Sequence, residues 1–356
     1  MSWKTPVVAV LTALVLVAVL APGTLAKKPV KPPPTPTASG TIYYIEDGVL
    51  HSMAPDGGSK AELGAAVTSP PSIALHGGKR WFLEARTVAG DPYPDDLDSP
   101  RQELFAVRED GTTFIQLTND PSLQPNVRGG AAPRWMTVGS TADGAVSYLA
   151  LRWSADGTVA EWGIYTLALD PAAVANGTHD ATAPTRVAVD VDLRSQYDEV
   201  TKTTTYYLNS RYTWSPDASS LVYVINPSEL WKATRSGDTW SETLLLDGGT
   251  APSWSPDGGR IAYYTGGTLR AMDPDGSNDS LVASAPSGNK NSWYAISGCA
   301  WSPSGTQLAY LRQKFTTRTI LATDRDVIRV DADGSDDESL TGDVKAYCIP
   351  LGWRGE

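Results

Sequence analysis

The side chains that most often carry catalysis are scarce in this 356-residue sequence. It holds three histidines, His51, His76 and His179, and no two of them have the spacing of a metal-binding pair. The Gly-x-Ser-x-Gly pattern, which exposes a nucleophilic serine on a sharp turn, does not occur. We therefore predict no catalytic residues. Two carboxylates facing each other across a channel would leave no such pattern, so a carboxylate enzyme stays an alternative.

Acidic residues gather in two segments that could hold a calcium ion. Asp273–Ser277 and Asp331–Asp336 carry several oxygen donors, and Asp337 and Glu338 add charge after the second. A calcium loop of the EF-hand type needs a third acidic position before its glycine and a bidentate glutamate near its end. Neither segment meets both conditions, so we predict no cofactor. Calcium at the second segment is the alternative.

A repeated phrase indicates which elements position these side chains. Trp-Ser-Pro stands at Trp214–Asp217, Trp254–Gly258 and Trp301–Gly305, and each copy leads into an apolar, strand-like run. The tryptophans are 40 and 47 residues apart (254 − 214 and 301 − 254). A repeat of that length built from strands is typical of a β-propeller.

The phrase has a physical meaning. Tryptophan supplies a large apolar surface at the end of a strand, proline ends the strand, and Asp-Gly or Ser-Gly reverses the chain. We therefore assign these tryptophans a structural role, packing between neighbouring sheets. The predicted anchors are Trp135, Trp214, Trp254, Trp301 and Trp353.

This repeat resembles that of the TolB-like, WD-like bacterial propellers. The second half of their unit, a strand followed by an acidic Asp-Gly turn, recurs at Leu104–Gly111, Leu269–Gly276 and Ile328–Gly334. The resemblance implies the fold. It leaves the function open, because binding proteins, lyases and accessory domains of peptidases all use this repeat.

The phase of the repeats predicts six blades of four antiparallel strands. Blades begin near residues 211, 251 and 298, a degenerate one begins at Ala132–Trp135, and another at Pro71–Ala74. Thr41–Met53 looks like the later strands of a blade without a first strand, and Ile349–Trp353 looks like that first strand. We expect the two chain ends to share the sixth blade and so close the ring.

The first 40 residues have a different character. Lys4, the apolar run Val7–Leu20 and the small residues of Thr24–Ala26 predict a signal peptide at residues 1–26, with an uncleaved anchor as the alternative. Residues 27–40 are rich in proline and read as a stiff linker. The propeller then covers residues 41–356. We expect an exported protein, periplasmic or extracellular, without a transmembrane segment in the mature chain.

Charge and cysteines restrict the partners and the compartment. The formal charge is −11, and loss of residues 1–26 removes one lysine and no acid, which gives −12. A nucleic-acid partner is not expected because no basic stripe is present to neutralise phosphates.

Cys299 and Cys348 each precede a predicted anchor, and in an exported chain they predict a disulfide between neighbouring blades. Two buried thiols are the alternative.

Long insertions are the expected place for recognition. Val88–Gln102 interrupts one blade and Gln196–Tyr206 enlarges another. We predict a monomer that binds a protein, peptide or glycan of the cell envelope or medium and catalyses nothing. The alternatives are a divergent polysaccharide lyase or hydrolase with carboxylates in the channel, and a TolB-like envelope assembly factor. The candidate contact residues are Tyr93, Tyr197, Tyr206 and Tyr207.

Overall fold

A computed structural model describes most of the chain from Ser39 onward. All described residues belong to one compact unit, which extends over Pro36–Glu356. Within them, no helix is long and apolar enough to cross a membrane. The described ranges are 39–47, 49–66, 73–76, 79–89, 101–108, 110–120, 122–125, 134–138, 141–153, 159–177, 185–189, 193–198, 203–208, 212–225, 228–237, 239–342 and 348–354.

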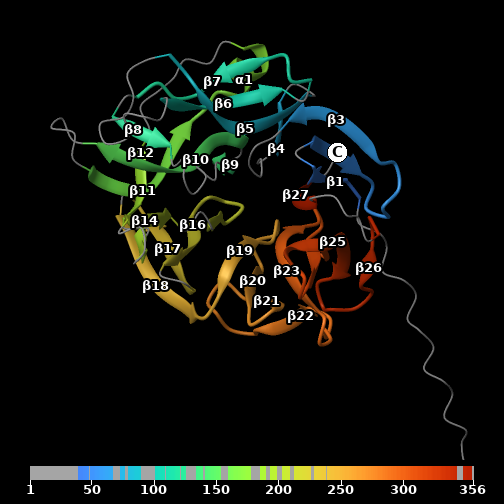
Figure 1. Cartoon of the computed structure of the whole chain (residues 1–356). Coiled ribbons are helices and arrows are strands. Elements are labelled where there is room, and N and C mark those ends of the chain that lie inside the picture. The colour runs from blue at the N-terminus through green and yellow to red at the C-terminus, as the bar shows by residue number, and fades with distance from the viewer. Residues whose placement is uncertain are drawn as a thin grey trace, which may run out of the picture. The chain divides into compact units, whose positions relative to one another are not determined.

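Five sheets have the four antiparallel strands that the repeat predicts (Figure 1). The terminal sheet joins the two ends of the chain and consists of β27 (Cys348–Arg354), β1 (Thr41–Glu46), β2 (Val49–Met53) and β3 (Ala61–Ala66). The next along the chain consists of β4 (Ile73–His76), β5 (Lys79–Thr87), β6 (Gln102–Arg108) and β7 (Phe114–Gln116).

The other three four-stranded sheets follow one another in the second half of the chain. One consists of β15 (Tyr212–Trp214), β16 (Ser220–Ile225), β17 (Glu229–Ser236) and β18 (Thr239–Asp247). The next consists of β19 (Thr250–Trp254), β20 (Ile261–Thr265), β21 (Thr268–Met272) and β22 (Ser280–Ser284). The last consists of β23 (Ser292–Trp301), β24 (Gln307–Thr316), β25 (Thr319–Asp331) and β26 (Glu338–Ser339).

The chain between these groups departs from the four-stranded pattern. A five-stranded sheet contains β8 (Leu123–Pro125), β9 (Arg134–Val138), β10 (Thr141–Trp153), β11 (Val159–Ala168) and β12 (Thr185–Val189). Here Trp135 keeps the preceding proline of the repeat, at position 133, but is not followed by Ser-Pro. Two short strands, β8 and β9, pair with different parts of β10. A separate hairpin of β13 (Leu193–Asp198) and β14 (Thr203–Leu208) follows, and a short helix, α1 (Pro171–Asn176), lies between β11 and β12.

The Trp-Ser-Pro turns show why these residues end one strand and begin the next. In the turn after Trp254, the Ser255 hydroxyl donates to Asp257 Oδ1 at 2.6 Å and accepts from the Arg260 backbone N–H at 2.8 Å. Asp257 Oδ1 also accepts from the Gly259 backbone N–H at 3.0 Å. Serine and aspartate therefore satisfy the backbone groups that a tight turn leaves without partners.

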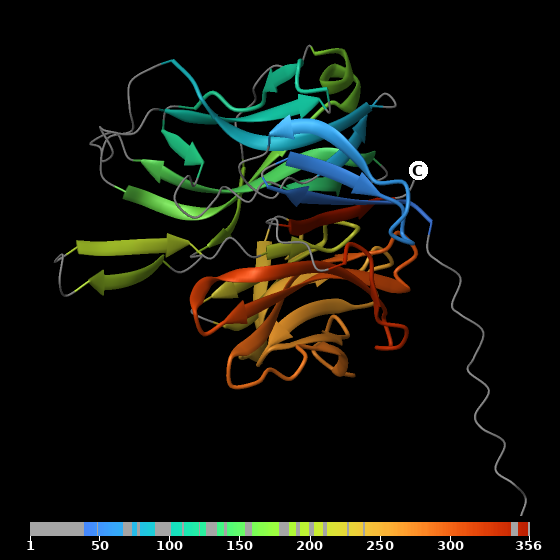
Figure 2. The same ribbon diagram turned by 45° about the vertical axis from the view of Figure 1, so that its right-hand side comes forward.

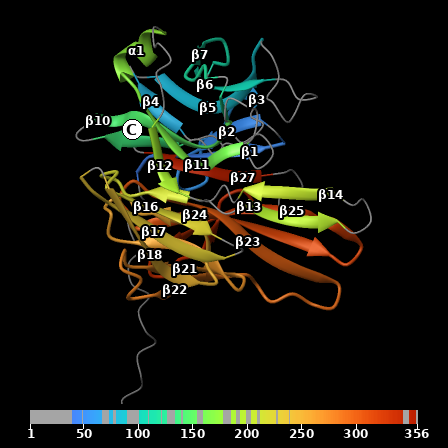
Figure 3. The ribbon, with the colours of Figure 1, turned by 90° about the vertical axis from the view of Figure 1, so that its left-hand side faces the viewer.

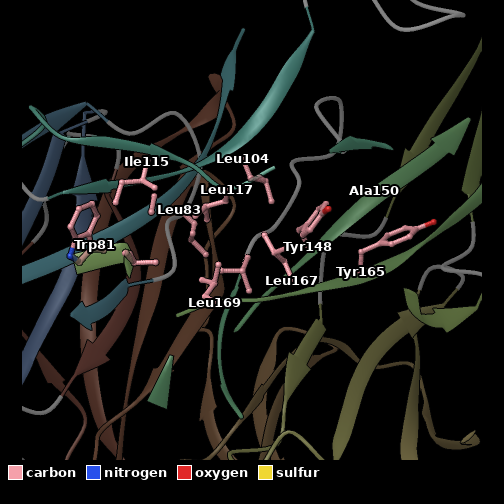
Figure 4. Packing of buried hydrophobic residues seen from close by; sticks show 13 residues of the cluster. Trp81, Leu83, Leu104, Ile115, Leu117, Tyr148, Ala150, Tyr165, Leu167 and Leu169 are labelled. Carbon is pink, nitrogen blue, oxygen red and sulfur yellow. The ribbon is translucent and has the colours of Figure 1, made fainter. Parts of the chain in front are cut away.

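Buried hydrophobic clusters join consecutive sheets in a closed series. Tyr43 and Phe82 belong to a cluster between the terminal sheet and the β4–β7 sheet, and Leu83 and Tyr148 to one between the β4–β7 sheet and the five-stranded sheet (Figure 4). The series continues through four further clusters, each with members from two consecutive sheets. They contain Leu149 and Tyr223, Val222 and Tyr263, Tyr264 and Leu308, and Leu311 and Ile42, and the last returns to the terminal sheet. The sheets therefore form a β-propeller arrangement.

The two ends of the chain share the terminal sheet, as the phase of the repeats predicted. β1 pairs antiparallel with β27, and Ile42 lies opposite Trp353. The indole of Trp353 is 5% exposed, and its Nε1 donates to the backbone oxygen of Ser39 at 3.2 Å. The closing strand therefore has both a ladder of backbone pairs and a buried aromatic anchor.

The predicted bond between Cys299 and Cys348 is not present, because Cys299 is a free cysteine. Alternation along β23 explains this. Cys299 and Trp301, two residues apart, both pack toward the β19–β22 sheet, whereas Ala300 packs toward the terminal sheet that contains Cys348. The thiol of Cys299 therefore faces away from the strand of its predicted partner. Burial raises the pKa of this thiol to about 12.

Candidate binding face

The antiparallel order gives the sheets two different ends. Turns from the first to the second strand and from the third to the fourth, which carry the Trp-Ser-Pro and Asp-Gly phrases, lie at one end, called here the turn face. Connections from the second to the third strand, and from each sheet to the next, lie at the other end, called the loop face. Figures 2 and 3 show the β13–β14 hairpin and the ends of β23 and β25 projecting on the same side.

The predicted recognition segments belong to the loop face. The segment Val88–Gln102 joins β5 to β6, and its base is closed by a hydrogen bond from the Val88 N–H to the Arg101 oxygen at 2.9 Å. Most of its residues, Tyr93 included, lie outside the described residues. The Gln196–Tyr206 segment forms the β13–β14 hairpin between the five-stranded sheet and β15.

The other three predicted contact residues belong to the two strands of the hairpin, Tyr197 to β13 and Tyr206 and Tyr207 to β14. Tyr197 pairs with Thr204, Tyr206 with Ser195, and Tyr207 with Arg194. Their assignment as contact residues stays a prediction.

The loop face also carries an extension that the sequence analysis missed. β23 and β24 are ten residues long and β25 is thirteen, whereas β19, β20 and β21 have five each. The additional residues, Ser292–Ser297, Arg312–Thr316 and Thr319–Asp326, form a three-stranded arm beyond the level of the neighbouring sheet. The residue types of Ser292–Trp301 give no signal for this extension.

One face of the arm is held by ion pairs between adjacent strands. Arg312 Nη2 lies 2.8 Å from Asp326 Oδ2, and Lys314 Nζ lies 3.5 Å from Asp324 Oδ2. The Asp326 side chain is 2% exposed and also accepts from the Thr341 hydroxyl at 2.9 Å. Because Asp326 is buried and both its carboxylate oxygens are bonded, these charges hold the strands of the arm together.

The opposite face of the arm presents two aromatic rings. Trp293 on β23 lies directly opposite Phe315 on β24, and their rings stack with centroids 5.4 Å apart and planes 8° apart. Trp293 is 46% exposed. An aromatic residue of this size that stays exposed on a rigid strand pair is a candidate contact for a ligand.

The turn face has a different chemistry, because its carboxylates serve its own turns. Hydrogen bonds from Ser255 and the Gly259 N–H lower the pKa of Asp257, and Ser277 and Ser335 do the same for Asp275 and Asp333. Across the described part of the chain, no group of three or more His, Cys, Asp or Glu side chains is placed to hold a metal ion. The acidic segments therefore act as turn formers in this structure.

Of the three histidines, His51 is the one whose side chain belongs to the described part of the chain. His51 stacks on Tyr44 with ring centroids 5.3 Å apart, while the side chain of His76 and the whole of His179 lie outside the described residues. Glu103 is fully buried, pairs with Arg101 and accepts from the Thr118 hydroxyl at 2.5 Å. These bonds account for the burial of a charged carboxylate at this position.

Four of the predicted tryptophan anchors have described side chains, and each packs with residues of a neighbouring sheet. Trp214 Nε1 donates to Ser147 Oγ at 2.8 Å, and Trp301 Nε1 donates to the Ser253 oxygen at 2.9 Å. Trp254 packs on the cluster shared with the β15–β18 sheet, and Trp353 on the one shared with the β23–β26 sheet. Trp135 lies on β9, with its side chain outside the described residues.

Comparisons with known proteins give no family. No family model matches the chain, and no curated protein sequence matches it. Similar solved structures include a putative 6-phosphogluconolactonase from Bacteroides uniformis, with 11% identity, a TM-score of 0.37, and coverage of 85% of this chain and 82% of that one.

Two further solved structures have comparable scores. A protein from Lactobacillus plantarum has 13% identity, a TM-score of 0.42, and coverage of 86% of this chain and 82% of that one. An ancestral GH74 enzyme has 10% identity, a TM-score of 0.45, and coverage of 88% of this chain and 43% of that one. At these scores the likenesses carry no argument about function, which rests on the chain's own residues.

Proposed function

We propose that this chain is an exported, monomeric propeller of the TolB-like repeat type that binds a protein, peptide or glycan through its loop face and catalyses nothing. In this proposal the five-stranded sheet is the sixth blade, since it packs between the β4–β7 and β15–β18 sheets. Residues 1–26 are a signal peptide and residues 27–40 a linker, which places the propeller in the periplasm or outside the cell.

The observation that carries the proposal is the contrast between the two ends of the propeller. The turn face uses its polar groups for its own turns, as at Ser255 and Asp257. The loop face carries the arm with its exposed Trp293, the β13–β14 hairpin and the segment between β5 and β6. Long connections on a rigid scaffold are where recognition residues are usually placed.

Affinity capture with a matched pair of variants tests the proposal. Residues 27–356 are immobilised and exposed to envelope extract and culture medium of the source organism. The loop-face variant combines Trp293→Ala with replacement of residues 199–202, which connect β13 to β14 in the sequence, by Asn-Gly. The control is Leu281→Ala, a change at an exposed apolar residue on the outer strand β22.

We expect a partner that the wild-type chain and the control retain and the loop-face variant loses. Equal retention by all three proteins would show that the loop face is not the binding surface. The same proteins are incubated with polysaccharides and peptides to look for turnover. Turnover that disappears when a channel-facing Asp or Glu is changed to its amide would contradict the binding proposal in favour of a lyase or hydrolase.

A further inference from the structure

Two adjacent turns form the tip of the arm. The backbone N–H groups of Asn289 and Ser292 each donate to the other residue's oxygen, at 2.8 and 3.2 Å, and close the turn before β23. The N–H of Thr317, in the turn between β24 and β25, donates to the Asn291 oxygen at 3.0 Å. A Cβ at Gly288 would lie 2.3 Å from the Ser292 oxygen, so the chain entering the first turn lies directly against β23. The two turns are therefore joined into one tightly packed tip.

The stacked rings of Trp293 and Phe315 lie next to this tip. Each belongs to a residue two positions from a joined turn residue, Asn291 or Thr317, which is about 7 Å along a strand. Trp293 keeps 46% of its surface exposed. Tryptophan combines a large apolar ring with a polar N–H, and it is enriched where an apolar phase meets water. This ring therefore suits the boundary region of a lipid layer.

The tip also carries positive charge. Lys290 lies in the first turn and Arg318 in the second, and both side chains are exposed. Within the described part of the chain neither takes part in an ion pair, whereas the two aspartates of the arm are held by the ion pairs described above. The tip of a chain whose formal charge is −11 thus has two uncompensated positive charges, which select an anionic partner.

The acidic turns of the turn face do not cancel this attraction. The ten residues of β24 separate them from the tip by on the order of 30 Å, several times the Debye length of about 8 Å at physiological ionic strength. An anionic partner that meets the tip first is therefore attracted by Lys290 and Arg318 and is screened from the acidic turns.

The shape of the tip favours a lipid surface over a soluble anionic ligand. Sites for small molecules are concave and enclose most of the ligand, whereas the arm projects, as Figures 2 and 3 show at the ends of β23 and β25. A stable protein interface buries about 800 Å² on each side, and a whole tryptophan supplies roughly 150–250 Å² of that. A layer of lipid headgroups needs neither a cavity nor a large rigid contact, because it closes around a projecting side chain.

We infer that the arm tip docks on an anionic lipid surface, with Trp293 among the headgroups and Lys290 and Arg318 beside their phosphates. The inference goes beyond the proposed function, which concerns a protein, peptide or glycan partner. One aromatic ring and two basic side chains give weak, reversible binding, because stable anchoring to a bilayer takes stronger signals. The arm would orient the loop face toward the surface without fastening the chain to it.

Sedimentation with lipid vesicles tests the inference. One set of vesicles is phosphatidylcholine alone, and the other is equal parts of phosphatidylcholine and phosphatidylglycerol, titrated to about 10 mM lipid because weak binding is expected. The proteins are residues 27–356 with the wild-type sequence, Trp293→Ala, and a double variant with Lys290→Gln and Arg318→Gln. The matched control combines Lys60→Gln with Arg235→Gln, which removes the same two charges from exposed positions on the turn face. Far-UV circular dichroism checks that each variant keeps the fold.

We expect the wild-type chain to bind the anionic vesicles more tightly than the neutral ones, and more weakly as salt is raised. A basic residue near an anionic surface contributes about fivefold to partitioning, so the double variant should bind about 25-fold more weakly. Trp293→Ala should bind about tenfold more weakly, because it loses the apolar surface that the headgroups cover. The turn-face control should bind at least as tightly as the wild-type chain.

Three results would overturn the inference. They are no binding of the wild-type chain to anionic vesicles, binding that either tip variant leaves unchanged, and an equal loss in the turn-face control. Polyglutamate and polygalacturonate are run in parallel as soluble polyanions. If they bind through Trp293 and the vesicles do not, the tip recognises an acidic peptide or glycan in place of a lipid surface. The capture experiment decides the proposed function separately, because a partner that needs the loop face supports it whether or not vesicles bind.

Discussion

Trp353→Ala tests the closure of the ring, because this residue anchors the last strand. Its side chain is 5% exposed and packs with Ile42, Tyr44 and Leu311 between two sheets. Burial of about 150–250 Å² at roughly 25 cal/mol per Å² gives an upper bound of about 4–6 kcal/mol. Truncation of buried large aromatics costs about 3–5 kcal/mol. The lost hydrogen bond adds little, because Ser39 is exposed and its carbonyl can accept from water instead.

We therefore expect Trp353→Ala to lower the free energy of unfolding by about 3–5 kcal/mol. Urea unfolding followed by circular dichroism and tryptophan fluorescence measures it, and coincident curves would show that the whole ring is affected. Trp293→Ala is the matched control, because the same truncation at a half-exposed site should cost roughly 1–2 kcal/mol. A loss below about 1 kcal/mol for Trp353→Ala would refute the assignment of this residue as the closing anchor.

Three further predictions concern turns and the free thiol. A Cβ at Gly57 would lie 2.8 Å from the backbone oxygen of Leu340, which follows β26, whereas one at Gly111, also at positive φ, would meet nothing within 4 Å. Gly57→Ala should therefore lose roughly 2 kcal/mol more than Gly111→Ala in urea unfolding, and equal losses would show that the contact between the sheets is not tight. Folding lowers the pKa of Asp257, so its stabilising effect is present above its unfolded pKa of about 4 and is lost as the pH falls through its folded pKa. Between pH 5 and pH 3, the free energy of unfolding should therefore fall less for Asp257→Asn than for the wild-type chain. Equal decreases would contradict this. Cys299 should resist alkylation at pH 8 in the folded chain, and both Cys299 and Cys348 should react after unfolding without reductant; a disulfide-linked peptide in mass spectrometry would contradict the free thiol.

The repeated phrase was informative because each of its residues has a local task. Tryptophan, proline and the acidic turn determine where a strand ends, so the positions of β15–β16, β19–β20 and β23–β24 could be predicted from spacing alone. The same phase argument placed Ile349–Trp353 beside Thr41–Met53, which the pairing of β1 and β27 confirms. Where the phrase decays, near Trp135, the chain forms a sheet with two short strands in place of one, which the pattern did not predict.

The candidate site could not be predicted in the same way. Ser292–Trp301 has the alternation of any strand, and nothing in its pattern indicates which of its residues extend past the neighbouring sheet. Trp293 therefore reads as one more aromatic residue of a strand. The orientation of Cys299 could have been predicted, because a residue two positions before Trp301 must face the same sheet as Trp301 does.

The point at which the chain enters the propeller determines how the protein is presented. Ser39 and Gly40 lead into the start of β1, which is the second strand of the terminal sheet and therefore begins at the turn face, beside Trp353. Ten residues of β24, at 3.3–3.4 Å each, separate the turn face from the tip of the arm by on the order of 30 Å. The chain therefore enters the propeller at the end opposite to the arm that carries Trp293, so a ligand held at the arm would not meet the first residues of β1.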